Sequence, residues 1–243
     1  MLAGIDRYMT GENPFSLALS LIISADRDLI EIISLSLQVS GLSAALALGL
    51  GLPLGAFIAT KRFYARSALI VLFNALLGLP PVVVGLTIYL LLSSNGLLGF
   101  ANLLYSPTAM VIAQFTLVFP IAVALTIQLL DSLNREYDSF FRSLGLSSTR
   151  RIAALLIDGR AGLITIMLAC LGRALSEVGA IIIVGGNINH VTRMMTTAIA
   201  LETSRGELAL AMALGVILLS TALIINIASQ LLKHHLEKEL GYE

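Results

Sequence analysis

Long apolar runs alternate with short polar segments along this chain. Five of the runs match or exceed the roughly 20 residues that an α-helix needs to cross the hydrocarbon core of a bilayer. The pattern therefore predicts an all-α integral membrane protein with one transmembrane domain over residues 1–243. Its five predicted transmembrane helices are residues 29–60, 67–92, 107–130, 161–184 and 207–232.

A shorter apolar run, Phe15–Ser24, precedes the first predicted span. It is too short to cross a bilayer, so we expect an interfacial or re-entrant helix there. This helix would belong to an outer N-terminal segment, residues 1–28. The first residues lack the basic stretch and apolar region of a cleaved signal peptide, so we expect no cleavage there.

Prolines punctuate the apolar runs. Pro80 and Pro81 lie inside the second predicted span, where they remove backbone donors and clash with the preceding turn. We therefore predict a kink or break at this point. Such a kink could serve gating, or it could reflect plain helix packing with Gly85 at a close contact. Pro107, in contrast, suits the first turn of the third span.

Composition supports the membrane assignment and excludes several functions. Charged residues make up 12% of the chain and the mean hydropathy is +0.93, whereas soluble domains carry about 25% charged residues. A net charge of zero gives no indication of a nucleic-acid partner. A single cysteine, Cys170, cannot form an intrachain disulfide. We predict no metal site, because His234 and His235 are adjacent and His190 has no partner at ligand spacing.

A polar island, Asp131–Arg160, separates the third and fourth spans and holds five arginines and four acidic residues. So many charges must lie in water. The stretch Arg135–Leu144 reads as a short amphipathic helix, and Gly145 follows it where a left-handed C-terminal residue is expected. Ser147 could then cap a second helix. This helix–turn–helix could be a docking element for a partner or an ordinary solvated loop.

Positively charged residues are unevenly divided between the two sides of the predicted topology. Ten fall on the side of the polar island and four on the opposite side. Since cytoplasmic loops are enriched in Lys and Arg, we predict a cytoplasmic island and C-terminus and an external N-terminus, in the cytoplasmic (inner) membrane. The ten are Lys61, Arg62, Arg66, Arg135, Arg142, Arg150, Arg151, Arg160, Lys233 and Lys238; the four are Arg7, Arg27, Arg193 and Arg205.

Arg173 and Glu177 are charged residues deep inside a predicted span, at residues 161–184. Because they are four residues apart on a helix, their side chains can pair. The free-energy cost of placing a charged side chain in lipid predicts that both face protein or water. They could belong to a translocation pathway or gate, or they could be a buried structural pair.

Gly185, Gly186 and Asn187 follow the same span. Their backbone and amide donors could form an anion-binding nest, although a glycine-rich helix stop is the favoured interpretation. The chain has no G-x-x-x-x-G-K-[ST] motif and no catalytic constellation at membrane depth, so we expect no enzyme activity of its own.

Two blocks of sequence resemble one family. GLPPVVVGLTIYLLLSSNGLLG (Gly78–Gly99) is similar to the second span of molybdate- and tungstate-type ABC-importer permeases. The segment Gly172–Gly215, with SEVGA, VGGN and ETSRG, is similar to the tungstate type in particular. Aligned on Gly145, the polar island resembles the cytoplasmic loop of these permeases, with Ser139 where the family has a glutamate. The resemblance covers most of residues 35–232.

The resemblance implies a type I ABC-importer fold and a homodimeric permease with the pathway at its axis. Two cytoplasmic ATPase subunits would bind ATP and Mg²⁺, so this chain itself would need no cofactor. An extracytoplasmic binding protein would deliver the oxyanion, which is tungstate by the closest resemblance, with molybdate or sulfate as alternatives. An ATP-independent secondary transporter is the alternative class. Residues implied in ATPase coupling are Ser139, Phe140, Phe141, Arg142, Leu144 and Gly145, and those implied near the pathway are Arg173, Glu177, Gly185, Gly186 and Asn187.

Overall fold

The computed structural model describes residues 19–20, 23–24 and 27–239, which form helices joined by short loops, with no β-strand within these residues. The all-α prediction is confirmed for this part of the chain. The predicted helix Phe15–Ser24 falls largely outside it. The helices are α2 (Arg27–Thr60), α3 (Arg66–Leu76), α4 (Pro81–Leu92), the 3₁₀ helix η2 (Gly99–Ala101), α5 (Pro107–Glu136), α6 (Asp138–Ser143), α7 (Ser148–Asp158), α8 (Arg160–Leu175), α9 (Gly179–Gly185), α10 (Met195–Arg205) and α11 (Leu208–Glu239).

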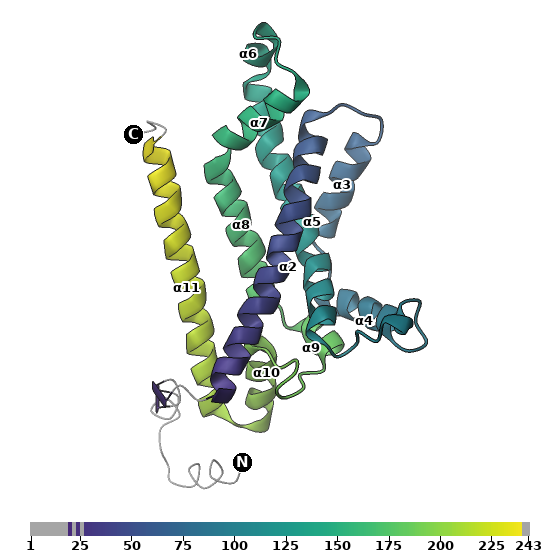
Figure 1. Cartoon of the computed structure of the whole chain (residues 1–243), viewed down its shortest axis with the longest axis vertical. Helices are drawn as coiled ribbons and strands as arrows, with labels where there is room; N and C mark the ends of the chain where they lie inside the picture. Colours follow the sequence, from purple (N-terminus) through teal and green to yellow (C-terminus); the bar gives the residue numbers. More distant parts are fainter. Residues whose placement is uncertain (1–18, 21–22, 25–26, 240–243) are drawn as a thin grey trace.

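Helices α2 and α5 form the central pair of the fold (Figure 1). Small residues let their backbones approach closely, as is common between membrane helices. A Cβ atom added to Gly51 would lie 2.7 Å from the Cβ of Ala122, and one added to Gly55 would lie 2.7 Å from the Cβ of Thr126. Helices α3 and α8 pack against α5, while α11 packs against α8 and α10.

Among the described residues, three helices are long and apolar enough to cross a membrane: α2, α5 and the part of α11 up to His234. The number rises to five if each of two bent helix pairs counts as one span. One such pair is α3 and α4, which meet at 102°. Pro80 is extended and Pro81 is the first residue of α4, so the predicted break at the two prolines is confirmed.

The predicted fourth span, residues 161–184, is not one helix. Helix α8 ends at Leu175, and after three residues the short helix α9 begins at Gly179. The following segment, residues 185–206, is expected to be a loop but contains α10, which ends at Gly206 with a left-handed φ of 82°. The last helix, α11, continues seven residues past the predicted end of the fifth span at residue 232.

The polar island is divided differently from the prediction. Helix α5 runs on to Glu136, and Tyr137 separates it from α6, so Arg135–Leu144 is not a single helix. The predicted turn is confirmed, since Gly145 has φ +61°. The amide of Gly145 donates to the Arg142 carbonyl and that of Leu146 to the Phe141 carbonyl, the two hydrogen bonds of a Schellman motif.

The molecule has two polar ends. At the upper end in Figure 1, α6 and α7 lie beyond the tips of the long helices, and the end of α11 lies on the same side. At the lower end, α10 lies beside the start of α2, and α9 lies beside α4 and α5. We refer to these as the α6 end and the α10 end. The α6 end holds the residues predicted to couple to an ATPase. The α10 end holds the residues predicted to lie near the pathway.

Candidate functional site

Helix α6 presents an apolar face to solvent. Phe140 is 57% exposed, and Leu144, which follows the last residue of the helix, is 56% exposed. Ser139, Arg142 and Gly145 are also exposed. Phe141 is turned into the chain instead: it is 5% exposed and packs in a cluster with Ala56, Ala59, Leu130 and Leu155.

Charged side chains fix α6 to α7. The Asp138 carboxylate accepts from Arg142 at 2.8 Å and from Arg151 at 3.0 Å. Partial desolvation raises the pKa of Asp138, but hydrogen bonds from the two guanidinium groups outweigh it, so the pKa lies below its ordinary value. The Arg151 guanidinium also lies 5.1 Å from the centre of the Phe141 ring. The short helix is thus held in a defined orientation.

At the α10 end, Glu177 connects three helices. The predicted pair forms, with Arg173 Nη1 2.5 Å from Glu177 Oε2. The other carboxylate oxygen accepts from the Ala180 amide at 2.9 Å, which caps the start of α9. The Glu177 carbonyl accepts from Thr196 Oγ1 of α10 at 2.8 Å. Glu177 is 3% exposed, so this arrangement supports the interpretation of a buried structural pair.

Gly185, Gly186 and Asn187 also join helices. Gly186 ends α9 with a left-handed φ of 70°, which confirms the favoured interpretation of a helix stop. Asn187 donates from Nδ2 to the Thr197 carbonyl at 3.3 Å and accepts from Thr197 Oγ1 at 2.8 Å. Its amide is therefore used to hold α10, and the structure provides no support for an anion nest here. The predicted pathway residues do come together, because Thr196 and Thr197 bind Glu177 and Asn187 side by side.

Gln114, in the first third of α5, was not among the functional residues predicted from the sequence. Its side chain is fully buried and donates to the Ala174 carbonyl at 2.8 Å and to Ser40 Oγ at 3.3 Å, which links α5 to α8 and α2. Its Oε1 atom is buried without a hydrogen-bond partner in the structure. The available signal was an amide side chain inside a long apolar run, since such residues mark helix contacts or pathways in membranes.

A second buried polar group in this region also escaped the sequence analysis. Glu202 of α10 is 4% exposed and lies 3.4 Å from both Arg193 and Arg205. The three residues fall in the segment expected to be a loop, where charges are normally solvated. They instead hold α10 against the preceding turn.

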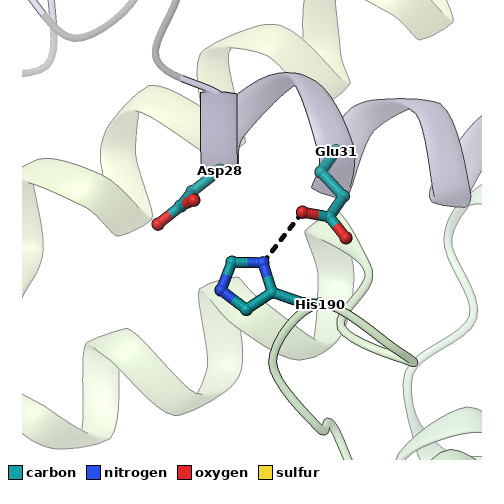
Figure 2. Close-up of side chains that lie close together, drawn as sticks. All are labelled: Asp28, Glu31 and His190. Carbon is teal, nitrogen blue, oxygen red and sulfur yellow. Dashed lines mark hydrogen bonds and ion pairs between the residues drawn. The ribbon is translucent and has the colours of Figure 1, made fainter.

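His190 meets residues that are distant in the sequence. Figure 2 shows its Nδ1 atom 2.9 Å from Glu31 Oε2, with Asp28 on the same turn of α2. Each of these three exposed residues offers one atom that could bind a metal ion, and the three atoms lie within 4.8 Å of one another. Sequence spacing could not show this, because His190 and Glu31 are 159 positions apart. The hydrogen bond to Glu31 raises the pKa of His190, and the charge of Asp28 adds to it, while Arg193 opposes it.

Raising the pH is expected to weaken this contact between the α9–α10 loop and α2. Because folding raises the pKa of His190, its protonated imidazole stabilises the folded state. This contribution is complete below the unfolded pKa of about 6.5 and is lost as the pH rises through the pKa of the folded state. The melting temperature of the purified chain should therefore fall between about pH 6 and pH 9 by more in the wild type than in His190→Gln. Equal falls in the two proteins would contradict the assignment.

The family model described as binding-protein-dependent transport system inner membrane component matches residues 51–241. The tungstate uptake system permease protein TupB of Peptoclostridium acidaminophilum is 39% identical over 212 residues, which are 87% of this chain and 93% of the relative. TupB of Campylobacter jejuni is 36% identical over 219 residues, 90% and 92% of the two chains. A probable anion ABC transporter permease protein of Haloferax volcanii is 38% identical over 205 residues, 82% and 88% of the two chains. More distant matches include sulfate and molybdenum transport permeases, at 25% and 26% identity.

The fold defines a multi-pass helical membrane protein with a short exposed helix at one polar end. The chain belongs to the family of binding-protein-dependent transport system inner membrane components. Its relatives are permease subunits of ABC importers, in which a separate subunit is the ATPase. Membership in this family implies an inner-membrane location, and ATPase and binding-protein partners.

Proposed function

We propose that this chain is the permease subunit of an ATP-driven importer that moves tungstate across the inner membrane by alternating access. The observation that carries the proposal is the similarity, over 87% and 90% of this chain, to two permeases named for tungstate uptake. Molybdate and sulfate are the second candidates for the cargo. They are also tetrahedral dianions, and permeases for their transport are more distant relatives.

Helix α6 is proposed to be the coupling helix that docks on an ATPase subunit. Its exposed apolar pair, Phe140 and Leu144, provides a docking face, and the buried Phe141 fixes the helix to the chain. Two such ATPase subunits would serve a homodimer of this chain and would bind ATP and Mg²⁺, so the permease needs no cofactor. The exposed apolar pair also argues against an ATP-independent secondary transporter, because such a transporter needs no docking face for an ATPase.

In the proposed topology the chain crosses the membrane five times, with α3 and α4 together counted as one span and α8 and α9 together counted as another. The α6 end would be cytoplasmic and the start of α2 external. Nine of the ten Lys and Arg residues predicted to be cytoplasmic lie at the α6 end, either near the tips of the helices or in α6 and α7. The tenth, Lys238, lies in the last turn of α11. The junction of α8, α9 and α10 around Glu177 and Asn187 would then lie toward the outer face, where the oxyanion enters.

Substituting the exposed face of α6 is the direct test of this function. Phe140→Asp is expected to weaken ATPase association by about 30-fold, the loss typical of an interface hot spot. Phe140→Leu is the matched control, since it keeps an apolar side chain at the same exposed position. The measurement is the amount of ATPase that co-purifies with each variant from cells, together with tungstate uptake.

Competition assays on the same cells decide the cargo. Tungstate uptake should be suppressed by excess unlabelled tungstate and much less by molybdate or sulfate.

Uptake that survives in Phe140→Asp at the wild-type rate, with the protein present in the membrane, would contradict the importer mechanism. A stronger effect of molybdate than of tungstate would leave the mechanism in place and change the cargo.

A further inference from the structure

A polar cavity of about 510 Å³ opens at the α6 end. It is bounded by the end of α2, the start of α3, the end of α5, and parts of α6 and α7. Five arginines and two aspartates line it, an excess of three positive charges. The lining residues are Ala59, Thr60, Arg62, Arg66, Asp131, Asn134, Arg135, Asp138, Arg142 and Arg151.

The two aspartates do not use up the hydrogen-bonding capacity of the arginines. Asp131 accepts from both Arg66, at 2.6 Å, and Arg135, at 2.7 Å. Asp138 is likewise shared by two arginines. Each guanidinium has five N–H donors, so many donors remain for another acceptor. One of them is Nε of Arg151, which is buried and has no hydrogen-bond partner in the structure.

The position of the cavity along the helices indicates the depth at which it lies in a membrane. Phe57 is 48% exposed one turn before the end of α2, and Val71 is 67% exposed five residues after the start of α3. At about 1.5 Å per residue, the cavity lies about 5–8 Å beyond these lipid-facing side chains. The headgroup layer is of the same thickness, about 5–8 Å on each side of the hydrocarbon core. Tyr64, in the loop between α2 and α3, is fully exposed, as is common at this interface.

We propose that this cavity binds the phosphate group of an anionic phospholipid. A guanidinium fork matches a phosphate with two parallel hydrogen bonds, and an excess of three charges selects a headgroup with net negative charge over a zwitterionic one. The headgroup depth of the cavity favours a lipid over an acidic side chain from a docked protein. The bound headgroup would brace α6 and α7 against the ends of α2 and α3. This proposal depends on membrane insertion and not on the identity of the cargo.

Native mass spectrometry of the purified full-length chain tests the proposal. With phosphatidylglycerol added, the wild type should retain lipid, and with phosphatidylcholine it should retain much less. The double variant Arg62→Gln/Arg135→Gln should bind phosphatidylglycerol about 30-fold more weakly, since each basic residue near an anionic lipid contributes about fivefold. Both arginines are exposed, so the fold should tolerate the change. The control Lys61→Gln/Arg150→Gln removes two charges from the same end, outside the cavity lining.

Adding inorganic phosphate separates the two possible sources of the phosphate group. If phosphate stabilises the wild type but not the double variant, and phosphatidylglycerol is not retained, the cavity is a site for free phosphate and the lipid proposal is overturned. Equal lipid retention by the double variant and its control would also overturn it. So would a double variant that keeps its lipid and loses only its ATPase, because the cavity would then be a protein contact.

Discussion

Glu177→Ala is expected to destabilise the chain by about 2 kcal/mol and to abolish transport, because the substitution removes the buried carboxylate from a partly buried ion pair. The Arg173 guanidinium would lose its carboxylate, and the Ala180 amide at the start of α9 would lose its acceptor. Thermal unfolding of the purified chain and uptake in cells measure the two effects. An Ala variant with wild-type stability would contradict the structural role of Glu177.

The matched variant Glu177→Gln separates the structural role from a role in the pathway. Glutamine keeps a side-chain oxygen that can accept from the Ala180 amide, but it cannot form the ion pair with Arg173. If Glu177 is structural, stability and uptake should recover together, in part, in the Gln variant. If its charge serves the pathway, the Gln variant should be more stable than the Ala variant and equally inactive.

Gly85→Val should be similarly damaging, for a steric reason. A Cβ atom at Gly85 would lie 2.7 Å from the Cα atom of Ala180 and 3.0 Å from its carbonyl oxygen. These are backbone atoms of α9, so no side chain can rotate away, and α4 must separate from α9. Overpacking by a few atoms costs about 1–3 kcal/mol, and a β-branched side chain at this contact should reach or exceed the upper value.

Gly49→Val is the control for this substitution. Gly49 lies in α2 with no atom within 4 Å of its added Cβ, so the same side chain fits there. A glycine inside a helix is itself unfavourable by about 0.5–1 kcal/mol, so the control should be neutral or slightly more stable. Equal melting temperatures for the two variants would show that α4 and α9 are not held together as described.

The sequence was sufficient where the physical signal was local. The adjacent Pro80 and Pro81 remove two successive backbone donors and break the helix there, and Gly145 suits a left-handed turn. Glu177 shows the opposite case. Its spacing from Arg173 predicted the ion pair, but not that its second oxygen would begin a new helix, because that depends on where α9 turns in space. The prediction of one continuous helix over residues 161–184 was wrong for this reason.

Contacts between distant segments were beyond the reach of sequence patterns. His190 and Glu31 become neighbours through the packing of the α9–α10 loop on α2. The hydrophobic periodicity of the sequence does not predict this contact. Phe140 and Phe141 were indistinguishable in the sequence as adjacent aromatics on a short amphipathic helix. Which of them is buried depends on how α6 turns after Tyr137 to meet the cluster around Leu130 and Leu155.

Helix α5 makes the two polar ends mechanically continuous. It runs through Pro120 without interruption for 30 residues, so it is a lever about 45 Å long. α6 follows one end after a single residue, and just before the other end the Tyr105 amide donates to the Val184 carbonyl of α9 at 3.0 Å. A rotation of about 5° around the α6 end would therefore displace the far end by about 4 Å, more than a hydrogen bond can stretch. A small tilt at α6 is enough to pull α9 away from its neighbours or to carry it along.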